Sequence, residues 1–541
     1  VDELYKQDSI HVVLPRHEQA LIHEAEGYAK ATGRVGVCLV TSGPGATNTI
    51  TGIADAHYDS IPLVIFTGQV PQSLIGNDAF QEVDIVGMTR SIVKYGVTVR
   101  DRKDLGKIIK MAFHIANSGK PGPVLIDIPK DIQTQSGPAN YPEHVDIRGY
   151  KPNETVHIGQ LKKAYKMLKS AKQPLLLAGG GVNISGAQEL LTTFAEKMRV
   201  PVVTTVMGKG AIPTDHPLYV GNSGMHGRYA ANMAVSECDV LFSVGTRFND
   251  RITGDLNEFA PKAKIVHLDI DASSISRNVV VDVPVVSDAK IALEHLVEWA
   301  EPKNTDKWLA KISAWQEENP LEMRRDHGLS PQMIMETIYE TFPQGIVVTD
   351  VGQHQMWATQ YITMPRGKQM ITSGGLGTMG FGFPAAIGAK IGDPDQDVVC
   401  ITGDGGMQMN MQEMATAICE KVPLTVCILN NNYLGMVRQM QQLFYGKRYE
   451  ITCLRRQVGC PDGCKGPNAA CPPYVPDFVK WAESYGAHGI RVQSEEEARE
   501  ALAKAKEYKD APTVIEFMIA TDEIVLPMVK SGNPMSEMIL K

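Results

Sequence analysis

The chain has 541 residues, and 53 Lys and Arg stand against 61 Asp and Glu, which gives a net charge of −8. This length is too great for one hydrophobic core and predicts three or four domains. There is no long basic block, and no apolar run is longer than a strand, so a nucleic-acid or membrane partner is not expected. Small-molecule chemistry is therefore favoured.

The nine cysteines are an odd number spread through a large chain, and no apolar leader opens it. This usage is typical of a reducing compartment rather than of a disulfide framework, so we expect a cytoplasmic protein. Because the first residue is not Met, we also expect that the sequence is truncated at its start.

In chain order, the first part alternates short β-branched runs with helical patterns. Strands are expected at 10–14, 35–40, 63–66 and 124–128. This βαβ rhythm predicts a parallel sheet. The polar stretch 135–154 contains Pro and Gly and is a predicted linker, with a boundary near Pro152. Residues 1–150 are therefore assigned to the first domain.

The same rhythm continues through two further predicted domains, 151–325 and 326–541. Strands are expected at 174–178, 240–244 and 265–269 in the second, and at 346–350, 398–402 and 424–430 in the third. A charged helical segment at 301–326 lies between them, and Ser330 is expected to cap a helix that begins at Pro331. The predicted fold class is α/β, with three consecutive doubly wound parallel-sheet domains.

Two polar clusters at predicted strand ends carry the strongest chemical signal. Gly403, Asp404 and Gly405 close one buried strand, and Asn431 follows the next strand, 27 positions after Asp404. Carboxylate and amide oxygens suit a Mg²⁺ ion that is held together with phosphates, and parallel sheets place ligands at this edge. Either cluster alone is usually only a turn, so their combination carries the hypothesis.

This pair of clusters resembles the binding motif of thiamin diphosphate enzymes. Such enzymes also need a Glu that hydrogen-bonds the aminopyrimidine ring of the cofactor, and Glu18 within Arg16-His17-Glu18-Gln19 matches that position. A lone Glu at a helix start is more often a favourable charge at the helix N-terminus. The resemblance therefore depends on the pairing of Glu18 with Asp404 and Asn431.

Further segments resemble the catalytic subunits of acetohydroxyacid synthase, also called acetolactate synthase, over essentially the whole chain. They include TSGPGATN at 41–48, DAFQE at 78–82, RFNDRITG at 247–254 and DVGQHQMW at 350–357. The resemblance implies an enzyme that decarboxylates pyruvate on thiamin diphosphate. It then joins the two-carbon fragment to pyruvate or 2-ketobutyrate, in the first common step of branched-chain amino acid biosynthesis.

The resemblance also implies a role for individual residues. The catalytic residues would be Glu18, Gln81, Lys130 and Met379, of which Met379 props the cofactor. Metal ligands would be Asp404, Asn431 and the backbone carbonyl of Tyr433, and the substrate pocket would contain Phe80, Arg251, Met436 and Met440. Thiamin diphosphate would contact Thr41, Pro44, Asn48, Gly352, Gln353, His354, Gly377, Met379, Gly405 and Gly406. FAD, without a net redox role, would contact Lys120, Gly179, Gly180, Met225, His226, Gly227, Arg247, Arg251, Asp269 and Asp288.

The sequence departs from the family pattern in four places. A further strand and a Gly-Pro-Gly loop are expected ahead of residue 1. Met440 stands where Trp is usual, and Lys120 stands where Arg is usual, which puts the substrate preference and the FAD affinity in question. A Gly- and Pro-rich insertion carries Cys453, Cys460, Cys464 and Cys471. Their spacing is not a standard zinc pattern, so free thiols are expected, with a structural metal as the alternative.

The family resemblance implies a homodimer or homotetramer with active sites between chains, and it leaves a small regulatory subunit possible. Two other functions stay open. One is a flavin oxidoreductase of the same superfamily, such as a pyruvate oxidase, against which DAFQE and RFNDRITG argue. The other is a non-catalytic binding or assembly subunit, which the incomplete start suggests.

Overall fold

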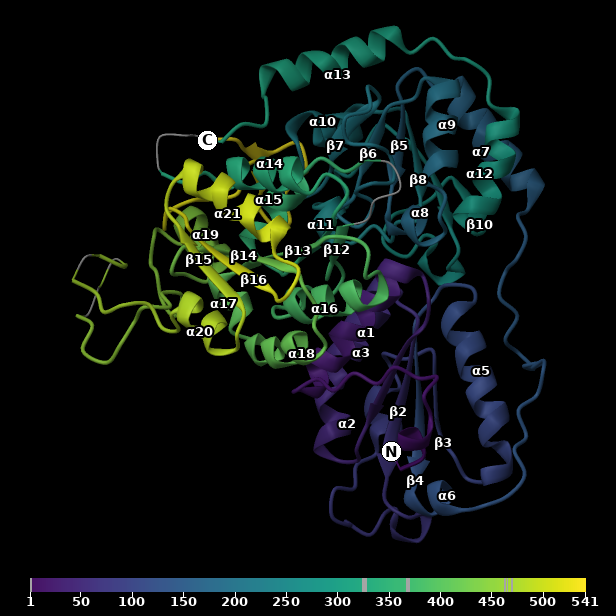
Figure 1. Cartoon of the computed structure of the whole chain (residues 1–541). Coiled ribbons are helices and arrows are strands. Elements are labelled where there is room, and N and C mark those ends of the chain that lie inside the picture. The colour runs from purple at the N-terminus through teal and green to yellow at the C-terminus, as the bar shows by residue number, and fades with distance from the viewer. Residues whose placement is uncertain (1, 324–327, 366–369, 462–463, 465, 469) are drawn as a thin grey trace.

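Three parallel β-sheets follow one another along the chain (Figure 1). The computed structural model describes residues 2–323, 328–365, 370–461, 464, 466–468 and 470–541. In Figure 1 the first domain lies at the bottom in purple, the second at the upper right in teal, and the third at the left in green and yellow. The predicted α/β class with successive parallel sheets is confirmed.

The first sheet has the strand order β1-β2-β4-β3, and every pairing in it is parallel. Its central strand β2 is apolar and almost wholly buried, as expected for a strand covered on both faces. The strands are β1 (Gly36–Val40), β2 (Leu63–Gln69), β3 (Tyr95–Thr98) and β4 (Pro123–Pro129). The helices are α1 (Glu18–Thr32), α2 (Pro44–Asn48), α3 (Ile50–Asp59), α4 (Ile85–Thr89), α5 (Leu105–Asn117) and α6 (Lys130–Thr134).

The strand expected at 10–14 is wrong, because these residues form no regular element. The side chains of Ile10, Val12 and Leu14 are 53%, 56% and 73% exposed. This apolar, β-branched run resembles a strand, but none of the described strands pairs with it, and strand geometry depends on such pairing. The first regular helix begins at Glu18, where the His17 ring accepts a hydrogen bond from the backbone N–H of Gln19.

The second sheet has six parallel strands in the order β10-β9-β8-β5-β6-β7. The change of direction between β5 and β8 is the place where an open α/β sheet binds ligands. The strands are β5 (Pro174–Ala178), β6 (Val202–Thr204), β7 (Tyr219–Asn222), β8 (Val240–Val244), β9 (Lys264–Asp269) and β10 (Val283–Val286). The helices are α7 (Ile158–Ser170), α8 (Gly180–Ile184), α9 (Gln188–Met198), α10 (Tyr229–Glu237), α11 (Asp250–Thr253), α12 (Ala289–Trp299) and α13 (Asp306–Glu318).

The third sheet also has six parallel strands, in the order β12-β11-β13-β14-β16-β15. The strands are β11 (Ile346–Thr349), β12 (Met370–Thr372), β13 (Val398–Gly403), β14 (Thr425–Asn430), β15 (His488–Val492) and β16 (Thr513–Met518), followed by the short antiparallel pair β17 (Met528–Val529) and β18 (Met538–Ile539). The helices are α14 (Pro331–Thr341), α15 (Gln353–Tyr361), α16 (Gly382–Gly392), α17 (Asp404–Met407), α18 (Met414–Cys419), α19 (Gly435–Phe444), α20 (Phe478–Ser484) and α21 (Glu495–Glu507).

Helix α14 begins at Pro331 as expected, but the predicted side-chain cap is wrong. The Ser330 hydroxyl makes no capping bond, and its oxygen finds no partner among the described residues. The fixed backbone angle of Pro331 therefore starts the helix without the hydroxyl.

Helices α1 and α16 join the first domain to the third by a close backbone contact (Figure 1). A Cβ on Gly27 would collide with the carbonyl oxygen of Ala385, and a Cβ on Gly388 would collide with the carbonyl oxygen of Glu24. These two glycines let the helices approach more closely than larger residues allow. The contact places the first helix of the chain directly behind the third sheet.

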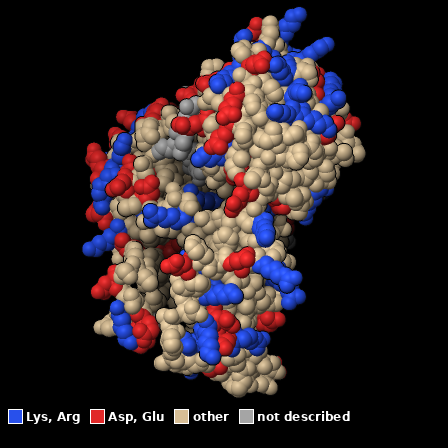
Figure 2. Space-filling model, turned by 90° about the vertical axis from the view of Figure 1, so that its right-hand side faces the viewer, with Lys and Arg blue, Asp and Glu red and all other residues tan. Residues whose placement is uncertain are grey.

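Acidic and basic side chains are interspersed on the face that Figure 2 shows, and neither sign forms a continuous field on it. Across the described ranges, none of the helices has both the length and the apolar character needed to cross a bilayer.

Candidate cofactor sites

A small cavity of about 70 Å³ lies at the carboxyl ends of β11, β13 and β14. Three loops that follow these strands line it, as expected at this edge of a parallel sheet. Ten of the predicted site residues form its walls: Gly352, Gln353, His354, Met379, Asp404, Gly405, Gly406, Asn431, Tyr433 and Met436.

The predicted metal ligands are brought together in this cavity. Asp404 is fully buried at the first position of α17, and burial raises the pKa of its carboxyl group to about 7. Tyr474 donates a hydrogen bond to this carboxylate. Asp404 Oδ2 finds no donor among the described residues, so one buried oxygen is left to bind a cation. This arrangement fits Mg²⁺, which prefers carboxylate and carbonyl oxygens.

The loop after β14 is held in the shape that a metal site needs. Asn431 Oδ1 accepts the backbone N–H of Tyr433 at 3.0 Å, and its Nδ2 donates to Gln353 Oε1 at 3.1 Å. Asn432 has a φ of 63°, in the left-handed region that Asn tolerates better than most residues. The turn therefore has a fixed geometry beside Asp404.

Glycines leave room for a diphosphate beside these residues. A Cβ on Gly405 would lie 2.7 Å from the Leu434 side chain, and a Cβ on Gly435 would collide with Gln353 Oε1. Burial lowers the pKa of His354 to about 3, so its ring is neutral, and Nε2 has no partner within the described chain. The backbone N–H groups at the start of α15 face the same cavity edge and favour an anion.

Met379 reaches this cavity from a loop with special backbone geometry. Gly377 and Gly380, on either side of it, have φ values of 76° and 88°. The Asp350 carboxylate accepts the backbone N–H groups of Gly380 and Gly382, each at 3.0 Å. Gly377 itself does not line the cavity. Met379 therefore lines the cavity, and its role as a prop for the cofactor stays a prediction.

The predicted residues of the first domain form a separate group, beside the loop after β1. Asn48 donates to Glu18 Oε2 at 3.0 Å, and Gly45 lies against Thr41 and Glu18. Gln81, with a φ of 59°, packs against Gly43 of the same loop, which also contains Pro44. None of these residues lines the small cavity.

The first-domain group is open to solvent in the single chain. The Phe80 side chain is 88% exposed, and Lys130, at the start of α6, is exposed as well. Within one chain, the structure therefore places Glu18 and Asp404 in two separate groups.

A much larger cavity, of about 850 Å³, lies where the three domains meet. Six residues predicted to contact FAD line it: Lys120, Gly180, Arg247, Arg251, Asp269 and Asp288. A volume of this size suits a dinucleotide. Gly181 and Gly245 approach so closely that neither tolerates a Cβ, and this opens the loop after β5 toward the cavity. The side chains that line this cavity and its volume therefore fit FAD.

The other predicted FAD residues lie near this cavity but do not line it. Gly179 packs against Gly245 and Thr246. Met225 is buried, and Arg251 donates to its sulfur at 3.6 Å. The His226 carbonyl accepts from Gln360 of α15, so its segment joins the second domain to the third. Gly227 is buried beside Asn232 in the same turn.

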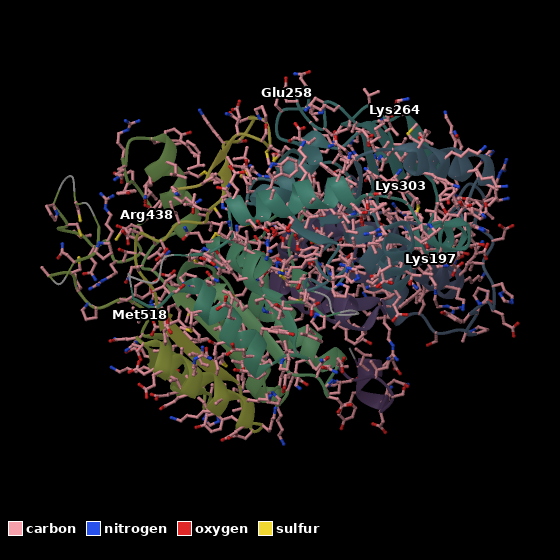
Figure 3. The ribbon with its side chains drawn as sticks, turned by 90° about the horizontal axis from the view of Figure 1, so that it is seen from above. Lys197, Glu258, Lys264, Lys303, Arg438 and Met518 are labelled. Atoms are coloured by element: carbon pink, nitrogen blue, oxygen red, sulfur yellow. The ribbon has the colours of Figure 1, made fainter. Side chains whose placement is uncertain are left out.

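Helix α19 carries two of the four predicted substrate-pocket residues, Met436 and Met440. Met436 lines the small cavity, whereas half-buried Met440 does not. Between them in sequence, Arg438 lies over the rings of Tyr433 and Tyr449, 4.9 and 4.7 Å from their centroids. Figure 3 places Arg438 on the side of the molecule opposite Lys197 and Lys303. Stacking of this kind fixes the helix against the predicted metal turn.

The four cysteines of the insertion carry free thiols. Within the described residues they are not grouped as metal ligands, and the one set of three convergent groups is His23, Glu26 and Asp55. The insertion lies close to the cofactor site, because Leu434 donates to the Thr452 carbonyl and Leu454 to the Asn432 carbonyl, each at 2.9 Å.

Sequence reasoning missed several residues that shape the site. Asp350 was predicted only as the end of a strand and the start of the segment DVGQHQMW, with no role of its own, although it holds the backbone at Gly380 and Gly382. Tyr474 lies 70 positions after Asp404, and no local pattern connects them. Asp55 and Asp59 gave one usable signal, since two acidic residues four positions apart on an apolar helix are expected to face a common partner.

The comparisons with known proteins agree with this geometry. Residues 1–88, 161–296 and 350–517 match, in turn, the families described as thiamine pyrophosphate enzyme N-terminal TPP binding domain, central domain and C-terminal TPP binding domain. The chain belongs to the thiamine pyrophosphate enzymes. Thiamine pyrophosphate is another name for thiamin diphosphate, so this is a thiamin diphosphate-dependent enzyme.

Curated relatives match almost the whole chain. A probable acetolactate synthase large subunit of Methanococcus aeolicus is 44% identical over 99% of this chain and 90% of its own length. The acetolactate synthase large subunits of Corynebacterium glutamicum and Haemophilus influenzae are 44% and 43% identical, over 99% and 100% of this chain and 85% and 93% of their own lengths. Within the thiamine pyrophosphate enzymes, the chain thus belongs to the acetolactate synthase large-subunit family.

Proposed function

We propose that the protein is an acetolactate synthase that joins pyruvate to a second pyruvate or to 2-ketobutyrate, with loss of CO₂. The observation that carries this proposal is the full-length identity to acetolactate synthase large subunits, in a chain whose small cavity holds the matching residues. The substrates are then small 2-keto acids.

The predicted site residues of the small cavity and of the first domain each have a task in this proposal. Asp404, Asn431 and the Tyr433 carbonyl hold Mg²⁺, and Gly352, Gln353, His354, Gly405 and Gly406 bind the diphosphate. Met379 would support the cofactor from the loop ahead of α16, and Glu18 would hydrogen-bond its aminopyrimidine ring and assist proton transfer there. The cofactor supplies a carbanion at that carbon and an electron sink for decarboxylation. Lys130, Gln81 and Phe80 face the substrate, and Lys130 offers positive charge to a carboxylate.

The active site forms between two chains, in a homodimer or homotetramer. This assignment is supported by the separation of the Glu18 group from the Asp404 cavity within one chain and by the exposed apolar side chains of the first domain. Val37, Leu39 and Phe80 are 53%, 48% and 88% exposed. A second chain that covers this face would bring its Asp404 cavity to the Glu18 group.

The larger cavity binds FAD as a structural cofactor. Its volume and its basic residues Lys120, Arg247 and Arg251 suit a dinucleotide diphosphate. Lys120 is already paired with Asp271 at 3.0 Å, which limits its strength as a phosphate ligand. A flavin that pyruvate bleaches stoichiometrically would instead indicate a pyruvate oxidase.

The proposal extends to the cellular setting of the enzyme. The name of the relatives implies a small regulatory subunit as a partner. Nine free cysteines support a reducing compartment, and we place the protein in the cytoplasm.

The deciding experiment is acetolactate formation from pyruvate by the purified chain, with Mg²⁺, thiamin diphosphate and FAD added together or omitted one at a time. Product that depends on all three supports the proposal. Cofactor binding without product, in a chain extended at its start as well, would indicate a non-catalytic binding subunit.

A further inference from the structure

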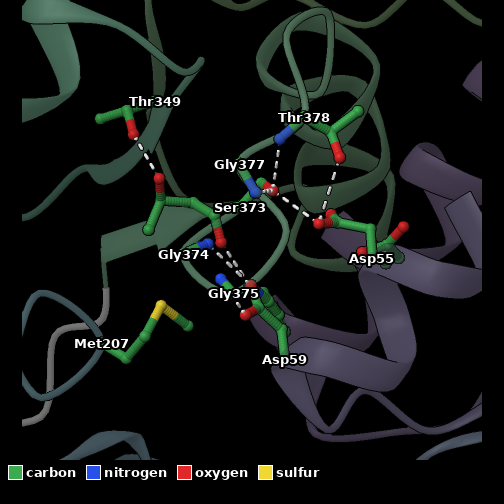
Figure 4. A network of polar contacts seen from close by, with 12 residues as sticks. Asp55, Asp59, Met207, Thr349, Ser373, Gly374, Gly375, Gly377 and Thr378 are labelled. Carbon is green, nitrogen blue, oxygen red and sulfur yellow. Dashed lines mark hydrogen bonds and ion pairs between the residues drawn. The ribbon is translucent and has the colours of Figure 1, made fainter. Parts of the chain in front are cut away.

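Two carboxylates of α3 hold the loop that leads to Met379 (Figure 4). Asp55 Oδ1 accepts the Ser373 hydroxyl at 2.5 Å and the Thr378 hydroxyl at 3.3 Å. Asp59 accepts the backbone N–H groups of Gly374 and Gly375, at 3.0 and 2.7 Å. The two acids are four positions apart, so they face the same side of the helix. Through these hydrogen bonds the first domain holds residues 373–378 of the third domain in place, and together the bonds form a grip on this loop.

The grip continues inside the loop. The Ser373 oxygen accepts the backbone N–H groups of Gly377 and Thr378 at 3.1 and 2.9 Å, so the bond from Asp55 fixes both ends of the turn. On its other side, the loop packs against Met207 of the second domain, where a Cβ on Gly374 would collide with the Met207 sulfur (Figure 4). Three domains meet at this loop.

The loop held by Asp55 and Asp59 leads from the large cavity to the small one. Gly374 lines the large cavity, and Met379 lines the small one. The Asp350 carboxylate holds the far end at Gly380. Any movement of residues 373–378 therefore changes the place of Met379 and the wall of the large cavity together.

A buried cluster of ionisable side chains lies behind Asp55. His23, Glu26 and Asp55 are wholly buried, and one ligand atom of each lies within 4.8 Å of the others. His23 Nδ1 is 3.0 Å from Glu26 Oε1. On the same helix, Lys30 binds Asp59 at 3.0 Å and the Thr372 carbonyl at 2.5 Å. Helix α1 thus contacts both Asp55 and Asp59.

The Glu26 and Asp55 carboxyl groups are close neighbours, with one oxygen of each within 4.8 Å of the other. Glu26 Oε2 and Asp55 Oδ2 find no hydrogen-bond donor among the described residues. Two buried carboxylates this close repel each other when both are ionised, so one of the two groups is expected to carry a proton. Burial raises the pKa of Asp55 to about 8 and raises that of Glu26, so the proton remains near neutral pH.

We propose that Asp55 and Asp59 are positioning residues for Met379, and that the proton shared by Glu26 and Asp55 keeps their grip on residues 373–378 closed. The inference rests on the proposed function for its catalytic consequence, but the grip itself does not depend on any cofactor. Loss of the proton places two adjacent negative charges in a buried site beside Asp59, and their repulsion loosens the contact between α1, α3 and the loop.

The other groups around the pair do not remove this repulsion. His23 faces the pair from α1, and burial lowers its pKa to about 4, so its ring is neutral. Lys30 is already engaged with Asp59. The buried Cys38 of β1 is neutral, and Asp350 adds negative charge near His23. Arg247 of the second domain lies beside Gly375 and over the Tyr58 ring, on the outer side of the loop.

The test measures amide hydrogen exchange of the peptide that spans 373–380 in the cofactor-free full chain, corrected for the intrinsic effect of pH. Asp55→Asn weakens a charge-assisted acceptor and is expected to lower protection about tenfold. Asp127→Asn is the matched control, because Asp127 is a buried acid of the same domain with three hydroxyl and amide donors and no contact with the loop. It is expected to leave the loop unchanged.

Glu26→Gln separates a positioning role from a merely structural one. Its amide donates to Asp55 permanently, so loop protection is expected to be equal at pH 6.5 and pH 9, whereas the wild-type chain loses protection at pH 9. Unchanged exchange in Asp55→Asn, or equal losses at pH 9 in Glu26→Gln and wild type, would overturn the proposal. Because no cofactor or substrate is present, failure of acetolactate synthesis would leave this readout intact.

Discussion

The side-chain amide of Asn48 donates a hydrogen bond to Glu18 Oε2 at 3.0 Å, beside the loop that follows β1. This bond orients the carboxylate at the first residue of α1 while the group remains partly exposed. The Glu18 carboxylate is thus held in one orientation before any ligand binds.

Glu18→Gln is expected to leave Mg²⁺ and diphosphate binding near the wild-type level, because no ligand of the small cavity changes. Exchange of the C2 proton of bound thiamin diphosphate is expected to fall by about 100-fold or more, as for a lost general acid–base contact. Nuclear magnetic resonance of acid-quenched samples measures this exchange. An unchanged rate would remove Glu18 from its role.

Asp404→Asn is expected to reduce Mg²⁺-dependent thiamin diphosphate affinity by about 10–100-fold, since the site loses its only formal negative charge among the three ligands. Titration of the cofactor at fixed Mg²⁺, followed by protein fluorescence, checks this. Gln408→Glu is a suitable control, because Gln408 contacts the same Tyr474 hydroxyl without being a ligand. Equal losses in both variants would point to disturbed packing rather than to a lost ligand.

Met440→Trp is expected to raise the preference for 2-ketobutyrate over pyruvate by about tenfold, because a larger apolar surface beside the second-substrate pocket favours the longer chain. Competition between the two acids, with both products quantified, measures the ratio. Met440 does not line the small cavity in the single chain, so an unaltered ratio would show that this part of α19 does not reach the substrate.

Much of the fold was predictable because its strands are buried on both faces. The runs at β5 and β8 are continuous and apolar, and their predicted bounds coincide with Pro174–Ala178 and Val240–Val244. The exposed segment at 10–14 is a similar apolar run, yet a strand also needs a partner, and pattern alone does not reveal one.

The candidate site was predictable only where its residues follow strands in short motifs. Asp404 and Asn431 could be placed because the strand ends of a parallel sheet meet at one edge. The bond from Ser373 to Asp55 joins residues 318 positions apart, and the Tyr474 bond to Asp404 depends on the path of an insertion. Such contacts follow from domain docking, which composition and periodicity do not encode.

Glu26→Gln is also expected to change how stability depends on pH. The native pair holds a proton above the usual carboxyl pKa, so its contribution to wild-type stability is greatest below about pH 4 and is lost as the pH rises toward 8. The variant lacks this proton uptake, and its stability relative to wild type is expected to rise by about 1.4 kcal/mol per pH unit across that window. Thermal unfolding at pH 5 and pH 8 gives the comparison, and parallel curves would contradict the shared proton.

In the proposed acetolactate synthase, each active site combines Glu18 of one chain with Asp404 of another. The most direct test co-expresses Glu18→Gln chains with Asp404→Asn chains and measures acetolactate formation. At a thiamin diphosphate concentration that just saturates the wild-type enzyme, each variant alone is expected to retain only a few per cent of wild-type activity. Random pairing makes half of the dimers mixed, and each mixed dimer has one intact site, so about a quarter of wild-type activity is expected to return. A mixture no more active than either variant alone would contradict a site shared between chains.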